Sequence, residues 1–151
     1  MNVIEFIFGA RPKNQEPDLI DETPQHVAWR LARPKPAPPV KAWCADADVR
    51  VETGQGVLSA RGGKDYIVDY GTSRAVIRGD IFTRTYKPRG GGQYEKRTDI
   101  VLRYFVLKRP AIVETLEGPQ RGEAGDWVME GVTGEIWPVP REKALAKYEP
   151  A

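Results

Sequence analysis

The chain has few of the side chains that enzymes commonly use as nucleophiles, bases or metal ligands. His26 is its only histidine and Cys44 its only cysteine, so neither residue type can supply a pair of metal ligands, and no internal disulfide can form. A Cys44–His26 nucleophile pair would need a third residue to orient it, and the sequence shows none. Three acids, Asp65, Asp69 and Asp80, remain as candidates for an enzyme site, but they have no paired base. We therefore expect no metal, no cofactor, and a binding protein in preference to an enzyme.

Aromatic and acidic residues give the first candidate binding surface. Their rings would supply contact area for a protein or a small molecule, and the acids would lie at the rim. The alternative is that the same rings belong to the hydrophobic core. The residues of this surface are Tyr66, Tyr70, Trp127 and Trp137, with Glu130 and Glu135 at the rim.

A basic, glycine-rich segment gives the second candidate. Residues 84–109 contain eight Lys or Arg against two acids, whereas residues 110–151 contain four against eight. The formal charge of the whole chain is only +2, so net charge alone does not predict nucleic-acid or membrane binding. Cations interleaved with tyrosine would suit single-stranded nucleic acid, through Arg84, Lys87, Arg89, Tyr94, Lys96 and Arg97. The alternative is a solvated linker weakly attracted to the acidic second half.

A spaced pattern that would position these residues occurs twice. It consists of T-x-x-G, then a glycine, then D-[YW]-[IV]-x-[DE], and finally Y-[KE]-P, over residues 53–88 and 115–150. Tyr148 follows Tyr86 by 62 residues, as Thr115 follows Thr53, while the Asp-aromatic step is shifted by one residue. Such a repeat predicts two similar structural units before any residue is given a role.

Short strand-forming segments between glycine-rich turns predict that both units are mainly β, with short helices. We expect two small barrel-like or sandwich-like units in tandem, each ending in a helical turn. The expected strands are residues 49–53, 57–60, 65–70, 74–78, 100–107, 111–115, 126–130 and 135–139, and the expected helical turns are 82–86 and 141–148.

This pattern divides the chain into four segments. Residues 1–39 would be an N-terminal arm with a proline-rich connector, 40–88 the first β unit, 89–97 a glycine-rich basic linker, and 98–151 the second β unit. Within the arm, Val3, Phe6 and Phe8 would form a short edge strand, and helical spacing over residues 18–33 predicts a short helix.

The N-terminus and the cysteine content bear on location. The apolar start of the chain lacks a basic n-region and is shorter than the ~20 residues of a membrane span. With a single cysteine, the chain suits a reducing compartment. We expect a cytoplasmic protein that does not contact a membrane.

The second half resembles a known group of proteins. It reads Lys108-Arg109-Pro110, Gly125-Asp126-Trp127-Val128, G-V-T-G-E-I-W-P over residues 131–138, and Tyr148-Glu149. This pattern resembles small bacterial and phage proteins of unknown function, of which the PGDYG proteins are the named group. The first half looks like a second copy with a weaker middle, so the resemblance covers roughly the last two thirds of the chain.

Two departures from the group's pattern are visible. Ala124 stands where the group has proline, and Ala144 stands where it has the aromatic residue that Phe82 matches. The resemblance implies the fold and a bacterial, phage or prophage origin, and no enzyme activity. Independently of any family, glycine ahead of an aspartate permits a tight turn, and the carboxylate can accept backbone N–H groups across it, so Asp65 and Asp126 are expected to shape turns.

Overall fold

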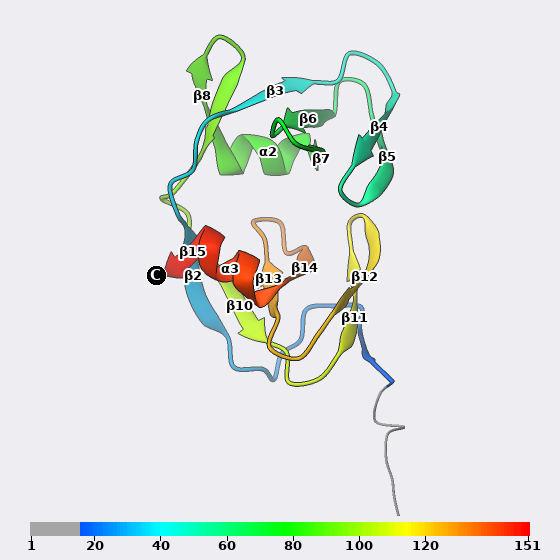
Figure 1. Cartoon of the computed structure of the whole chain (residues 1–151), viewed down its shortest axis with the longest axis vertical. Helices are drawn as coiled ribbons and strands as arrows, with labels where there is room; N and C mark the ends of the chain where they lie inside the picture. Colours follow the sequence, from blue (N-terminus) through cyan, green and yellow to red (C-terminus); the bar gives the residue numbers. More distant parts are fainter. Residues whose placement is uncertain (1–15) are drawn as a thin grey trace, which may run out of the picture.

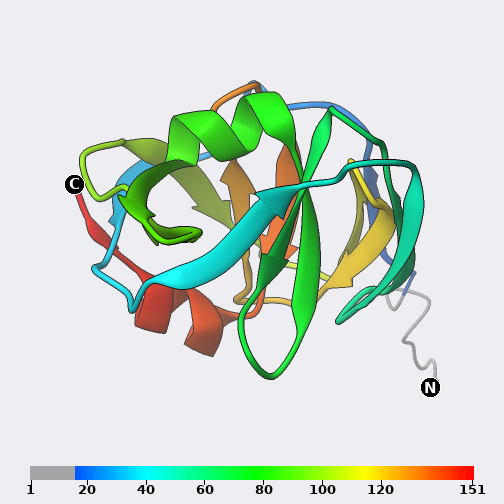
Figure 2. The same ribbon diagram turned by 90° about the horizontal axis from the view of Figure 1, so that it is seen from above.

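The structure is a computed structural model that describes residues 16–151, and the mainly β class is confirmed. The edge strand predicted at Val3, Phe6 and Phe8 lies outside the described residues. Figure 1 shows the chain as two halves stacked along the long axis, and Figure 2 gives the view from above. All four sheets within residues 16–151 are open, so neither half is a closed barrel.

The first half is built on an antiparallel five-stranded sheet with the order β7-β6-β3-β9-β8. Its strands are β3 (Val40–Cys44), β6 (Asp65–Asp69), β7 (Arg74–Arg78), β8 (Tyr86–Gly90) and β9 (Gln93–Lys96). A separate hairpin pairs β4 (Val49–Thr53) with β5 (Gly56–Ala60), and helix α2 (Gly79–Thr85) lies between β7 and β8 in the chain.

The second half has a five-stranded sheet with the order β14-β13-β10-β2-β15. Its strands are β10 (Leu102–Val106), β13 (Trp127–Glu130), β14 (Ile136–Val139), β15 (Tyr148–Pro150) and β2 (Arg30–Pro34). A hairpin pairs β11 (Ala111–Thr115) with β12 (Gly118–Gly122), and β1 (Asp18–Ile20) joins β11 in parallel. Helix α3 (Arg141–Lys147) precedes β15.

Elements of the two halves correspond at the 62-residue spacing of the sequence pattern. Helix α3 begins and ends 62 residues after α2, and hairpin β11–β12 lies 62 residues after β4–β5. Backbone hydrogen bonds follow the same spacing. Arg97 N donates to Thr85 O at 2.9 Å, and Lys35 N donates to Lys147 O at 2.8 Å. The two sheets therefore have the same strand order, with β2 in the place of β9.

Strand β2 corrects the expected helix over residues 18–33 and the expected connector. The structure has β1 and β2 there, and β2 pairs with β10 on one side and β15 on the other. Ala32 and Pro34 point into the core, while Leu31 and Arg33 are exposed. This period of two is that of a strand, and long-range pairing overrides the weak helical spacing. The second half therefore takes one strand from the N-terminal segment.

The glycine-rich segment 89–97 is also not a linker. Strands β8 and β9 form a hairpin that completes the first sheet, and Gly90, Gly91 and Gly92 make its turn with φ of 96°, 65° and 75°. Positive φ is costly for residues with a side chain, so the three glycines serve the turn.

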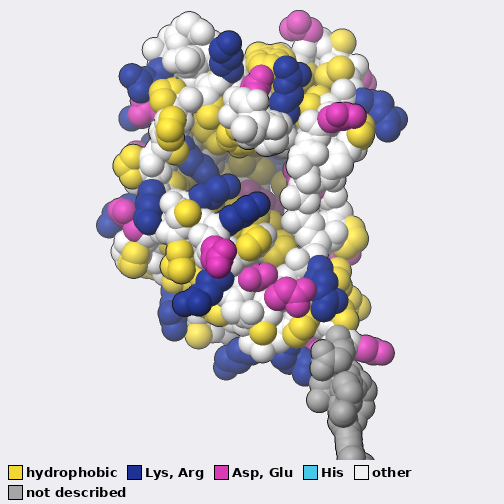
Figure 3. Space-filling model, in the orientation of Figure 1, with side chains coloured by type: hydrophobic (Ala, Val, Ile, Leu, Met, Phe, Trp, Pro, Cys, Tyr) yellow, Lys and Arg dark blue, Asp and Glu magenta, His cyan; other side chains and the backbone are white. Residues whose placement is uncertain are grey.

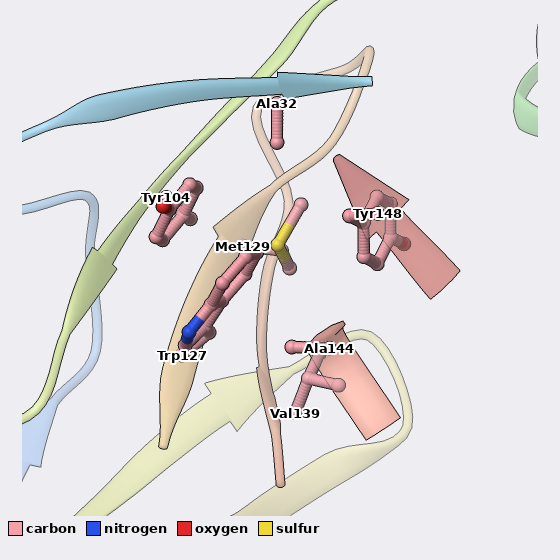
Figure 4. Packing of buried hydrophobic residues seen from close by; sticks show 7 residues of the cluster. All are labelled: Ala32, Tyr104, Trp127, Met129, Val139, Ala144 and Tyr148. Atoms are coloured by element: carbon pink, nitrogen blue, oxygen red, sulfur yellow. The ribbon is translucent and has the colours of Figure 1, made fainter. Parts of the chain in front are cut away.

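Each five-stranded sheet is covered on both faces. In the first half, α2 covers one face, where Phe82 stacks on Tyr66 with ring centroids 4.2 Å apart, and hairpin β4–β5 covers the other. In the second half, α3 and hairpin β11–β12 take the same positions. Figure 4 shows the α3 side, where Tyr104 stacks on Trp127 at 3.7 Å. Each half thus buries its own core.

The two expected aspartate turns are present. The Asp65 carboxylate accepts the backbone N–H of Arg61 at 2.8 Å, and the Asp126 carboxylate accepts that of Glu123 at 2.9 Å. Asp126 also accepts the backbone N–H of Arg141 at 3.2 Å, at the first residue of α3. Both carboxylates therefore hold turns, as the sequence predicts.

Candidate functional site

A cleft of about 720 Å³ lies between the two halves. Its walls come from both: α2 and β7 on one side, α3 and β14 on the other, with the tips of hairpins β4–β5 and β11–β12 at one end. Figure 3 shows a hollow between the halves with an apolar floor and basic side chains around it. The halves touch directly where Arg78 donates to the Thr133 hydroxyl at 3.0 Å.

Lys96 is the charged group most enclosed by the cleft. It is the last residue of β9, directly opposite Tyr86 on β8, and it is half-buried. Its Nζ atom lies 5.8 Å from the centre of the Tyr148 ring, which belongs to the other half. Burial, and next the positive charge of Lys147, lower the pKa of Lys96 to about 8. Within residues 16–151, no carboxylate lies within ion-pair distance of it.

Three tyrosines surround this lysine. The Tyr86 and Tyr70 hydroxyls lie 3.4 Å apart and share a hydrogen bond. Burial raises the pKa of Tyr86 well above its usual range, and it raises the pKa of Tyr148 to about 12. All three rings line the cleft, and at neutral pH the two buried hydroxyls remain protonated donors.

The remaining charges of the cleft separate into paired and unpaired groups. Arg61 binds Asp65 at 2.8 Å, Arg78 binds Asp80 at 2.6 Å, and Arg74 binds Asp69 at 3.5 Å. By contrast, three lysines of the lining make no ion pair with the described part of the chain, and they are Lys96, Lys143 and Lys147. The unpaired charge of the cleft is therefore positive.

The first candidate surface is split between core and cleft. Trp127 is buried, and Tyr66 is half-buried against Phe82, so both rings belong to the core, as the alternative interpretation held. Glu130 pairs with Arg103 at 2.5 Å. The other three residues of the surface line the cleft, namely Tyr70, Trp137 and Glu135.

The residues of the second candidate are dispersed. Arg97 pairs with Asp99 at 2.8 Å, Arg89 pairs with Glu95 at 3.4 Å, and the Tyr94 ring packs into the core of the first half. Arg84 and Lys87 are exposed. Of the six residues, only Lys96 lines the cleft.

The residues considered for catalysis do not form a site. His26 is exposed between β1 and β2, and Cys44 is half-buried at the end of β3. Asp65, Asp69 and Asp80 each pair with an arginine. No group of three or more histidine, cysteine, aspartate or glutamate residues within residues 16–151 is arranged to hold a metal ion.

A second hollow, of about 860 Å³, lies on the first half alone, between β4 and the loop that joins β6 to β7. Its acids are already engaged: Asp48 accepts the backbone N–H of Gly62 at 2.8 Å, and Asp69 pairs with Arg74. The Arg74 guanidinium also lies over the Trp43 ring, 5.4 Å from its centre. These internal contacts leave the cleft between the halves as the better candidate.

Sequence reasoning missed four cleft residues: Tyr86 and Tyr148 as lining residues, and Lys143 and Lys147 on α3. The repeat contains the signal that marks the lysines. At the 62-residue spacing, Lys96 stands where the first copy of the pattern has Pro34, and Lys147 stands where it has Thr85. The two copies thus agree in the tyrosines of the cleft and differ in its cations.

In the described part of the chain, neither helix is long and apolar enough to span a bilayer. Comparison of the chain with protein-family models, with curated proteins and with solved structures finds no match.

Proposed function

We propose that the protein is a non-enzymatic binding module that holds its ligand in the cleft between the two halves. The observation that carries this proposal is a cleft of about 720 Å³ to which both halves contribute, lined by tyrosines and by lysines without ion-pair partners in residues 16–151. This volume is typical of small-molecule sites, which range over ~300–1,000 Å³.

The groups of the cleft favour binding over catalysis. General acid–base chemistry works best with a group whose pKa lies near the operating pH. Tyr86 and Tyr148 are shifted away from neutral pH, and the Asp65 carboxylate is held by Arg61. Lys96 has the pKa nearest neutrality, but it has no carboxylate or imidazole beside it to move a proton.

Thermal-shift measurements with a chemically mixed panel of small acids, amines, sugars and nucleosides test the proposal. Ile81→Trp fills the wall of the cleft on α2, whereas Leu145→Trp places the same ring on the exposed side of α3, outside the cleft. Compounds that stabilise the wild type and Leu145→Trp, but not Ile81→Trp, support the cleft. They should also be recovered chemically unchanged after incubation. Hits that Ile81→Trp does not affect, or an empty panel, would contradict the proposal.

Single-stranded nucleic-acid binding through residues 84–109 is the alternative function. It has less support because Arg89 and Arg97 are already paired and Tyr94 is packed into the core. A gel-shift series with single-stranded DNA and RNA over a range of salt concentrations decides it. Retention that falls steeply with salt supports the alternative, and no retention at low salt removes it.

We also propose that the two halves are copies of one unit. The shared strand order, the equal spacing of α2 and α3, and the matching aspartate turns support this. A cytoplasmic location and a bacterial, phage or prophage origin, with the likeness to PGDYG proteins, remain predictions from the sequence.

A further inference from the structure

We propose that the ligand of the cleft is a small organic anion whose phosphate or carboxylate group binds between Lys96 and Lys147. This inference rests on the proposed function and adds to it the chemical class of the ligand and the residues that recognise it.

The first argument is the cost of the lysine pair. Lys96 is half-buried on β9, and the charge of Lys147 on α3 is close enough to lower its pKa. Placing a cation in a poorly solvated position beside another cation is unfavourable unless an anion compensates for it. No carboxylate of residues 16–151 fills that role, so an anionic ligand would supply the missing partner.

The surroundings of Lys96 lack any acid that would make the site self-sufficient. Tyr86 lies opposite on β8, Tyr148 faces it from β15, and Lys147 approaches from α3. Its sequence neighbour Glu95 pairs with Arg89. The groups that face Lys96 are therefore one cation and two protonated phenols.

The second argument comes from the repeat. Strand β2 holds Pro34 at the position that Lys96 occupies on β9, and Pro34 lines the same cleft. Helix α2 likewise has Thr85 where α3 has Lys147. Because the fold accommodates uncharged residues at the equivalent positions, neither lysine is required for strand pairing or helix formation. A ligand accounts for both.

The third argument concerns the rest of the ligand. Beyond the lysines, the lining includes the apolar side chains of Ile81, Ile100, Leu102 and Val139. A site of this composition suits a molecule with one charged end and an apolar body. Lysine acts as a point charge rather than a planar fork, so it accepts phosphate and carboxylate alike.

Lysine-selective ¹³Cε NMR on the full chain tests this assignment, with phenyl phosphate, benzoate and neutral benzamide as probes. The Lys96 signal is the one missing from Lys96→Met. In the free protein its titration midpoint should lie near 8. With phenyl phosphate or benzoate bound, the midpoint should rise by about one unit, which corresponds to a tenfold preference of the anion for the charged lysine. The two anions distinguish the phosphate source of the charge from the carboxylate source.

Affinities measured by calorimetry complete the test. Lys96→Met should weaken the anion by about tenfold or more, Lys96→Arg should retain most of the binding, and Lys108→Met, an exposed lysine outside the cleft, should change nothing. An equal midpoint shift from sodium chloride at matched ionic strength would show screening alone and overturn the assignment. So would equal affinity of benzamide, or unchanged anion affinity in Lys96→Met. These results would leave the cleft itself intact, because the Ile81→Trp screen also contains neutral compounds.

Discussion

Replacing Phe82 by alanine should be among the most destabilising single changes in the first half. The Phe82 side chain is 1% exposed. It stacks on Tyr66 at 4.2 Å and on Tyr86 at 4.8 Å, and it meets Tyr94 edge to face at 4.9 Å. Truncating a buried phenylalanine costs about 3–5 kcal/mol, through lost burial and the cavity that remains. Since each aromatic pair contributes roughly 0.5–1.5 kcal/mol beyond burial, we expect the upper part of that range.

Urea unfolding and calorimetry measure this loss. For a chain of 151 residues, each kcal/mol lowers Tm by about 2–4 °C, so Phe82→Ala should lower Tm by on the order of 10 °C. Leu145→Ala is the control, because Leu145 lies on the other helix and is 49% exposed, and its cost should stay below about 1 kcal/mol. A loss from Phe82→Ala no larger than that of Leu145→Ala would refute the stacked core described here.

Three further predictions concern a buried acid, a crowded glycine and the cleft lysine. Hydrogen bonds from Arg61 lower the pKa of Asp65, so its contribution to stability is present above the unfolded pKa and is lost as pH falls through the folded one; Asp65→Asn should cost about 1–3 kcal/mol at pH 7, and the difference from wild type in urea unfolding should shrink towards acid pH. Gly79→Ala should destabilise by about 1–3 kcal/mol because its Cβ would press on the Lys64 carbonyl oxygen, whereas Gly54→Ala, with open space around it, should stay within about 0.5 kcal/mol when both are compared by thermal unfolding. Lys96→Met should raise Tm at pH 7, because the folded protein holds this lysine with its pKa lowered to about 8, and the gain should diminish as pH rises and the native lysine loses its proton; equal Tm at pH 7 would mean that burial of Lys96 carries no cost.

Local features of the fold were predictable from the sequence because they depend on neighbouring residues. Strands β7 and β11 have the predicted ends, and the turns at Asp65 and Asp126 have the predicted bonds. Strand β2 was not predictable, because its period of two extends over only five residues and its partners lie about 70 and 115 residues further along the chain. The hairpin at residues 86–96 was misread for a related reason, since glycines that serve a turn resemble glycines of a linker.

The cleft escaped prediction because it is a property of how the two halves share strands. Strand β2 precedes β3 in the chain but pairs in the second sheet, and β9 precedes β10 but pairs in the first. The chain therefore crosses between the halves directly after Pro34 and directly after Lys96, and both residues line the cleft (Figure 1). The first crossing contains three prolines, which hold an extended backbone. The second begins with the Arg97–Asp99 pair.

Separating the two walls would strain both crossings, whose flanking strands are held by hydrogen bonds on both sides. A cleft held in this way is largely preorganised, so a ligand that binds there spends little of its interaction energy on ordering the protein. The position of Lys96 follows from the same geometry. As the last residue of β9 before a crossing, it is fixed by strand pairing while its side chain faces the other half. The shared strands thus place one charged side chain at the junction of the two units, where neither half alone could enclose it.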